Sequence, residues 1–155
     1  MVTPQLFSFY PYAMKKNILF LCTGNSCRSQ MAEGWARHLH SEHIDASSAG
    51  IEIHGLNPLA VQVMAEAGVD ISRHSSKLVH GLPEQHFDLV VTVCGYADAK
   101  CPFFPGSTKV IHHGFDDPPT LSEEQRGAKE DTLVFYRRVR DEIRRFVEES
   151  PLFAQ

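Results

Sequence analysis

The strongest chemical signal in the chain is the segment Cys22–Ser29, CTGNSCRS, in which five residues separate a cysteine from Arg28. It follows the apolar run Ile18–Leu21, so we expect a strand, a glycine-containing turn and then a helix. Backbone N–H groups of such a turn form an anion nest, and the helix adds the positive end of its dipole. Arg28 supplies a planar fork that matches two oxygens of a tetrahedral oxyanion. These positive surroundings favour the thiolate of Cys22, which we predict to be a nucleophile.

Two polar residues of this loop are predicted to support the nucleophile. Ser29 falls in the first turn of the expected helix, where its hydroxyl can donate to the Cys22 thiolate. Asn25 is expected to brace the loop, since Gly24, Asn25 and Ser26 suit a tight turn with unusual backbone angles. The alternative interpretation is a buried cysteine at a strand end, with an arginine nearby by chance.

The chain has further cysteines beyond the loop. Cys94 and Cys101 are suited to a thiol relay, in which one thiol attacks a Cys22 adduct and the next resolves the disulfide. Together with His112–His113 they do not match a zinc spacing, so no metal site is predicted. Cys27 is expected to be a bystander.

Strand-like and helical patterns alternate along the sequence. Strands are expected over 17–22, 44–49, 89–93 and 109–111. Helices are expected after the cysteine loop, from Asn57–Pro58 to Gly68, over 72–80, and near the C-terminus, where an apolar stripe runs beside a solvated arginine face. This alternation predicts an α/β sandwich around a four-stranded parallel sheet.

Three segments with chemical potential each follow an expected strand, namely Cys22–Ser29, Cys94–Cys101 and His112–Pro119. Ligands of such sheets bind at the carboxyl ends of the strands, so we expect the three segments to meet there. In the last one Asp117 is a candidate general acid for a departing oxygen. An ordinary acidic turn is the alternative for Asp116–Pro119.

Composition narrows the class of protein. The 155 residues suffice for one domain, predicted over 14–155, and residues 1–13 are expected to be an N-terminal extension that is loosely ordered. A net charge of −4 gives no footprint for nucleic acid or an anionic membrane. No apolar run reaches the roughly 20 residues of a membrane span. Four cysteines and no secretory pattern predict a cytoplasmic protein with reduced thiols.

Cys22–Ser29, continued by Gln30–Gly34, resembles the loop of the low-molecular-weight tyrosine phosphatases and, more closely, that of the thioredoxin-coupled arsenate reductases. Further resemblances to the latter lie in the segments 48–52, 90–94, 101–102, 114–118 and 137–143. The resemblance extends from Met14 to about Val147. It implies a three-layer sandwich with phosphatase-like (flavodoxin-like) topology, acting as a monomeric oxidoreductase in arsenic detoxification.

The resemblance also implies a mechanism. Cys22 attacks arsenate, which is held by Arg28 and the loop, and Asp117 protonates the leaving water. Cys94 then attacks the Cys22 adduct and releases arsenite, and Cys101 resolves the disulfide for reduction by thioredoxin. The loop residues implied to bind the substrate are Thr23, Gly24, Asn25, Ser26, Cys27, Arg28 and Ser29.

Some members of this family bind potassium beside the loop, through residues that match Asn25, Glu33 and Ser48 and an acidic residue. In this chain Lys77 stands in the segment of that acid. We expect its ammonium to replace the cation and to support the loop together with Asn25, Ser29, Glu33 and Ser48, with no tightly bound cofactor. The alternative is a solvated Lys77 with the ion absent or weakly bound.

Other functions remain open at this point. A phosphatase acting on phosphotyrosine or small phosphate esters needs Cys22, Arg28 and Asp117 but neither later thiol, and Pro119 stands where such enzymes usually have a tyrosine. A non-enzymatic thiol sensor would not need an acid. A reductase served by glutathione or mycothiol would make less use of two spare thiols.

Overall fold

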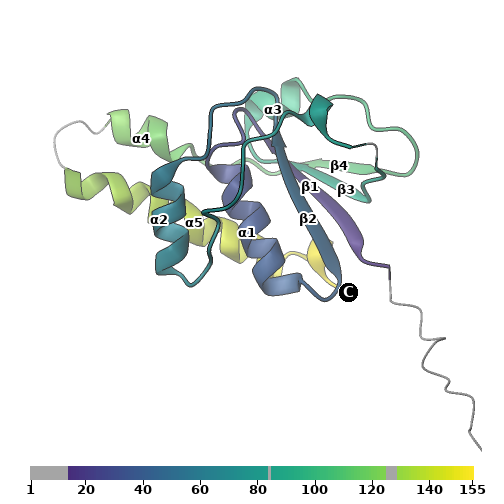
Figure 1. The fold of residues 1–155 in the computed structure, drawn as a ribbon, viewed down its shortest axis with the longest axis horizontal. Helices are drawn as coiled ribbons and strands as arrows, with labels where there is room; N and C mark the ends of the chain where they lie inside the picture. Colours follow the sequence, from purple (N-terminus) through teal and green to yellow (C-terminus); the bar gives the residue numbers. More distant parts are fainter. Residues whose placement is uncertain (1–13, 84, 125–128) are drawn as a thin grey trace, which may run out of the picture.

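A computed structural model describes residues 14–83, 85–124 and 129–155, so the predicted extension over residues 1–13 lies outside the described part of the chain. Within it, four strands form one parallel sheet in the order β2-β1-β3-β4 (Figure 1). The strands are Lys16–Cys22 (β1), Ile44–Gly50 (β2), Leu89–Thr92 (β3) and Lys109–His112 (β4). The helices are Arg28–His40 (α1), Pro58–Glu66 (α2), Gly95–Ala99 (α3), Pro118–Glu124 (α4) and Lys129–Glu149 (α5), with 3₁₀ turns at Val79–Gly81 and Pro151–Phe153. The predicted α/β sandwich with a four-stranded parallel sheet is confirmed.

Strand β1 carries Cys22, the predicted nucleophile, to the edge of the sheet. It pairs with β2 along its whole length, ending at Cys22 and Gly50, and with β3 on its other side. Residues 18–21 are completely buried, as expected for a central parallel strand covered on both faces. Figure 1 shows α3 at the carboxyl end of β1 and β2. Cys22 therefore emerges where ligands of parallel sheets bind.

Helices α1 and α5 pack against each other beside the sheet. The indole N–H of Trp35 on α1 donates to the carbonyl of Arg140 at 3.1 Å, and the Trp35 ring is buried. Val139 and Ile143 of the predicted apolar stripe are fully buried. The predicted arginine face of this helix is only partly solvated. The Arg140 side chain is just 13% exposed and donates to the carbonyl of Val63 at 2.9 Å.

The helix predicted over residues 72–80 is wrong. Apart from the 3₁₀ turn at Val79–Gly81, the segment is irregular and runs beside the end of β2. The N–H of Gly50 donates to the carbonyl of Lys77 at 2.7 Å, and Leu78 forms a parallel bridge with Gly50. Serine side chains compete with helical hydrogen bonds, and here pairing with the sheet edge overrides local propensity.

Two short helices, α3 and α4, were not predicted from the sequence. Helix α3 lies in the segment that joins Cys94 to Cys101, which the sequence left undefined. Helix α4 begins at Pro118, a residue suited to the first helical turn, and ends at Glu124. Residues 125–128, which follow it, lie outside the described residues.

The close approach of β2 to the nucleophile loop gives a first prediction. A Cβ on Gly50 would collide with the carbonyl oxygen of Glu52 and lie 2.8 Å from the backbone N of Asn25. Since backbone atoms cannot rotate away, Gly50→Ala should lower the free energy of unfolding by about 1–3 kcal/mol in urea denaturation. Gly81→Ala is the control, because its Cβ would meet nothing closer than 3.9 Å. Equal stabilities of the two variants would contradict this packing.

Candidate active site

The segments that follow β1, β3 and β4 meet at the carboxyl edge of the sheet, as their order predicted. Nη1 of Arg28 donates to the carbonyl of Phe115 at 3.0 Å, and its Nη2 lies 3.4 Å from Oδ1 of Asp117. Oγ1 of Thr23 lies 3.2 Å from Sγ of Cys94. These contacts join the loop after β1 to the segments after β4 and β3.

A pocket of about 230 Å³ opens at this edge. It is lined by Cys22, Thr23, Gly24, Ser26, Cys27, Arg28, His54, Asp117 and Pro119. Cys22 is only 2% exposed, so a reactant reaches its sulfur through this pocket. An oxyanion held by the loop would lie between a guanidinium and a carboxyl group.

Ser29 lies where the sequence pattern places it, with its Oγ 2.8 Å from Sγ of Cys22. The same Oγ accepts a hydrogen bond from Nδ2 of Asn25 at 2.8 Å. Because the Ser29 oxygen already accepts this proton, its own hydroxyl hydrogen is free to point at the sulfur. The arrangement favours donation from Ser29 to a Cys22 thiolate.

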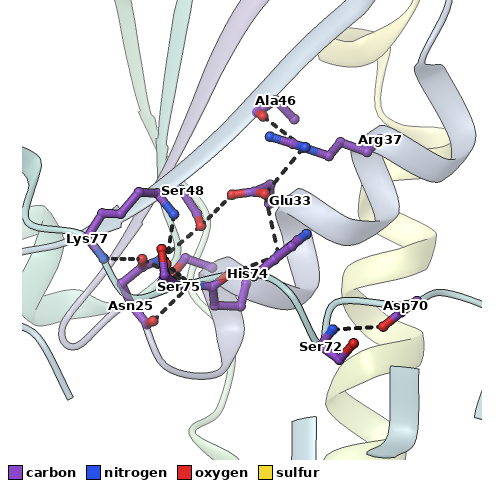
Figure 2. Close-up of polar contacts among 12 residues, drawn as sticks. Asn25, Glu33, Arg37, Ala46, Ser48, Asp70, Ser72, His74, Ser75 and Lys77 are labelled. Atoms are coloured by element: carbon purple, nitrogen blue, oxygen red, sulfur yellow. Dashed lines mark hydrogen bonds and ion pairs between the residues drawn. The ribbon is translucent and has the colours of Figure 1, made fainter. Parts of the chain in front are cut away.

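Asn25 is the buried brace of the loop (Figure 2). Its backbone φ of 49° lies in the left-handed region, which asparagine tolerates better than most residues. Nδ2 also donates to Oγ of Ser48 at 2.9 Å, and Ser48 donates to Oε1 of Glu33 at 2.8 Å. One amide thus links the loop to β2 and α1.

Lys77 supports the loop in a way that differs from the prediction. Its backbone N–H donates to Oδ1 of Asn25 at 2.8 Å, while its ammonium donates to the carbonyl of Ser75 at 2.8 Å (Figure 2). Any residue with a free N–H can make the first contact. The second ties the lysine to its own segment.

The charge of Glu33 is met by other residues. Its Oε2 lies 3.3 Å from Nε of Arg37 and 3.4 Å from Nδ1 of His74. Burial lowers the pKa of His74, against the pull of the Glu33 carboxylate. Oδ1 of Asn25 already accepts two N–H groups and Ser48 makes two hydrogen bonds, so these oxygens do not fit a potassium ion. Within the described ranges, no group of three or more His, Cys, Asp or Glu side chains is arranged to hold a metal.

Gln30, which is fully buried, was not among the predicted site residues. Its Nε2 donates to Oδ1 of Asn25 at 3.0 Å and to the carbonyl of Ser75 at 3.0 Å, and its Oε1 lies 3.0 Å from Nδ1 of His74. The available signal was a polar residue beside Ser29 in the first turn of the helix, on the side that carries the loop.

His54 was also missed. Its ring lines the pocket, and Nε2 lies 2.7 Å from Oε2 of Glu52. The backbone N–H groups of Glu52 and His54 donate to the carbonyls of Thr23 and Gly24 at 2.8 and 3.0 Å. The segment that carries His54 is therefore held against the loop, and His54 contributes to the wall of the pocket. No periodic pattern in the sequence indicates this position.

The four cysteines are free thiols in different surroundings. Cys94 is buried at the start of α3, where its Sγ accepts a hydrogen bond from the N–H of Ala97 at 3.4 Å. Cys101 is half-buried, and its Sγ donates to the carbonyl of Pro102 at 3.5 Å. Burial raises the pKa of both Cys101 and Cys27 above the usual thiol value.

The raised pKa of Cys27 predicts a low reactivity. A group with a raised pKa holds less thiolate at neutral pH, and each pKa unit removes about tenfold of the reactive form. Iodoacetamide at pH 7 should therefore modify Cys27 at least about tenfold more slowly in the native protein than in protein unfolded with guanidinium. Peptide mass spectrometry should show Cys101 modified before Cys27, since Cys101 is less buried. Equal rates at the two thiols would contradict this environment.

Known proteins similar to this chain include phosphatases and arsenate reductases, in agreement with an anion loop that carries a cysteine. Residues 17–150 match the family described as low molecular weight phosphotyrosine protein phosphatase. An arsenate reductase of Bacillus licheniformis is 52% identical over 129 residues, which cover 83% of this chain and 90% of that protein.

Solved structures agree with these matches. An arsenate reductase in its oxidized state superposes with a TM-score of 0.70 at 29% identity, covering 86% of this chain and 94% of that chain. An arsenate reductase in its phosphate-binding state gives 0.67 at 29% identity, covering 90% and 97%. The chain thus belongs to the low molecular weight phosphotyrosine protein phosphatase family, alongside the arsenate reductases that share its fold.

Proposed function

We propose that this protein reduces arsenate to arsenite through a relay of Cys22, Cys94 and Cys101, with thioredoxin as the external reductant. The observation that carries the proposal is the position of Cys94. The Cys94 thiol lies against Thr23, which follows Cys22 in the chain. Thr23 belongs to the loop that also presents Arg28 to an anion. A phosphatase has no use for a second thiol there. The curated relative from Bacillus licheniformis, which covers most of the chain, carries the name arsenate reductase.

The first step uses the phosphatase part of the site. The loop from Thr23 to Ser29 and the Arg28 guanidinium bind arsenate, and the Cys22 thiolate, supported by Ser29, attacks arsenic. Asp117, 3.4 Å from Arg28, donates a proton to the departing oxygen, which leaves as water. The product is a Cys22–arsenic adduct in which arsenic is still pentavalent.

The second step uses Cys94. Its sulfur attacks the Cys22 sulfur, a disulfide forms, and the electron pair of the sulfur–arsenic bond stays on arsenic. Arsenic is thereby reduced from the pentavalent to the trivalent state, and the two thiols are oxidised. The Thr23 hydroxyl, 3.2 Å from the Cys94 sulfur, can stabilise the attacking thiolate.

The third step requires α3 to move. Cys101 must reach Cys94, form the second disulfide and free Cys22. Helix α3 spans only five residues and is capped by a weakly accepting thiol, so its loss is energetically cheap. A Cys94–Cys101 disulfide left near the surface would suit reduction by thioredoxin.

The proposal assigns a supporting role to the residues behind the loop. Asn25, Ser29, Glu33 and Ser48 form one hydrogen-bonded chain, and Lys77 adds its backbone N–H. We place the protein in the cytoplasm as a monomer, where thiols stay reduced and thioredoxin is available. Among the described helices, none has the length and apolar character needed to cross a membrane.

A phosphatase activity is the second candidate, and the shared anion loop favours it. Cys22, Arg28 and Asp117 are all that hydrolysis of a small phosphate ester requires. Pro119 lines the pocket at the position where a tyrosine phosphatase would need an aromatic wall for the phosphotyrosine ring. We therefore expect weak hydrolysis of small esters beside arsenate reduction.

The variant Cys101→Ser separates the two activities. With thioredoxin, thioredoxin reductase and NADPH, its arsenate-dependent NADPH oxidation should fall by at least about 100-fold, because the Cys22–Cys94 disulfide cannot be passed on. Hydrolysis of p-nitrophenyl phosphate should stay within about twofold of the unmodified protein. The mass of the Cys22–Cys94 disulfide should accumulate in one turnover. Sustained arsenate turnover by this variant would refute the relay.

The surroundings of Glu33 predict insensitivity to potassium. Arg37 and His74 already lie beside its carboxylate, and N–H groups occupy the oxygen of Asn25. Arsenate turnover measured in potassium chloride and in sodium chloride at equal ionic strength should therefore agree within about twofold, equivalent to less than about 0.5 kcal/mol. A larger stimulation specific to potassium would show that the loop still uses an ion.

A further inference from the structure

We propose that His54, oriented by Glu52, is a proton donor for the step that releases arsenite. The inference rests on the proposed function, because only arsenate reduction needs a proton donor beyond Asp117. Residues 51–54 lie outside the loop and outside the thiol relay. Their geometry and the proton balance of the second step carry the argument.

The proton balance separates the two chemistries. Hydrolysis of a cysteinyl phosphate, Cys–S–PO₃²⁻ plus water, yields thiolate, HPO₄²⁻ and one released proton. In the relay, Cys22–S–AsO₃²⁻ and Cys94–SH yield the disulfide and As(OH)₃ only if two further protons are taken up. The three arsenic oxygens gain negative charge as the electron pair arrives on arsenic, so a positioned donor lowers the barrier to their departure.

Asp117 alone does not account for these protons. It gave its proton to the leaving water in the first step and stays a carboxylate until it is reprotonated. Arg28 remains charged throughout and does not act as an acid. Among the groups that line the pocket, this leaves the thiol of Cys27, whose pKa burial raises, and the imidazole of His54.

His54 has the geometry of a carboxylate-oriented base and acid. Its Nε2 is held 2.7 Å from Oε2 of Glu52, the arrangement by which a carboxylate fixes the direction of an imidazole. The opposite nitrogen, Nδ1, is the ring atom nearest to where a Gly24 side chain would stand, and a Cβ there would overlap the ring. The free nitrogen therefore lies against the nucleophile loop. The side chain is about half exposed, so solvent can reload it.

Glu52, which orients His54, is also connected to the segments that carry the two reacting thiols. Glu52 bonds through its backbone to Thr23, which follows Cys22 and touches Cys94. The other carboxylate oxygen of Glu52 faces the hydroxyl of Tyr96 on α3 at 3.5 Å. His54 thus lies beside the loop in the same pocket as Cys22, and its partner Glu52 contacts the segment that carries Cys94.

The test is a single-turnover experiment in the Cys101→Ser background. Arsenate is mixed with reduced protein, the reaction is quenched with acid, and the Cys22–Cys94 disulfide and released arsenite are quantified over time. His54→Gln should slow both by about 100-fold, a typical contribution of a general acid. Its hydrolysis of p-nitrophenyl phosphate should stay within about threefold, since that reaction needs no additional donor.

A matched control is available on the surface. His86 also faces a carboxylate, with Nε2 3.5 Å from Oδ1 of Asp88 and a similar exposure, but it lies outside the pocket. His86→Gln should leave both reactions unchanged. In His54→Ala, added imidazole should restore disulfide formation, which a purely structural role of the ring would not allow.

The outcomes are separable. If His54→Gln forms the disulfide at the parental rate, or loses both reactions in parallel, His54 is not a proton donor for arsenite release. If the Cys101→Ser parent itself forms no Cys22–Cys94 disulfide with arsenate, the proposed function fails and takes this inference with it. Slow disulfide formation with intact ester hydrolysis and imidazole rescue supports the proposal.

Discussion

The amide of Asn25 is the interaction on which the site depends. Its backbone takes a left-handed conformation inside the protein, and its side chain has no contact with solvent. Nδ2 donates to two serine hydroxyls at once, so each serine must point its own hydrogen elsewhere. Ser29 then faces the Cys22 sulfur, and Ser48 faces Glu33. One residue therefore sets both the shape of the loop and the direction of the hydroxyl that faces the Cys22 sulfur.

The loop held by Asn25 is backed by Glu33, whose carboxylate is satisfied by side chains of the protein itself. A buried carboxylate such as Glu33 is costly unless it is paired. Arg37 and His74 approach its second oxygen, and Ser48 donates to the first. The loop is thus held by a network in which donors and acceptors are matched, and none of the side-chain polar atoms buried in the described residues lacks a partner.

The sequence predicted what local residue types determine. The strand before Cys22, the loop, the helix after it and the contact between Ser29 and Cys22 follow from an apolar run, a glycine-containing turn and a serine one residue into the helix. Strand order along the chain was enough to expect Asp117 and Cys94 near the loop. These are consequences of short-range pattern and of the rule that ligand sites lie at the carboxyl ends of parallel strands.

What the sequence could not reveal depends on tertiary packing. The segment 72–80 has a helical pattern, but its backbone finds partners on β2 and on Asn25 that a local reading cannot see. For the same reason Lys77 was assigned through its charge, whereas its backbone N–H makes the contact with the loop. His54 gave no signal, because its position depends on Gly24 leaving room for a ring that comes from another segment.

The fold poses a question of chemistry that the anion loop alone does not answer. Arsenate and phosphate have similar shape and charge, so an anion site formed by Arg28 and the loop amides would accept both. What differs is the fate of the adduct, which water hydrolyses in one case and a thiol reduces in the other. Reduction needs an attacking sulfur within reach and protons for the departing oxygens. In the proposed mechanism Cys94, against Thr23, supplies the sulfur, and His54, in the pocket, supplies a proton. A phosphatase-like site would then act as a reductase through residues that need not bind the anion more tightly.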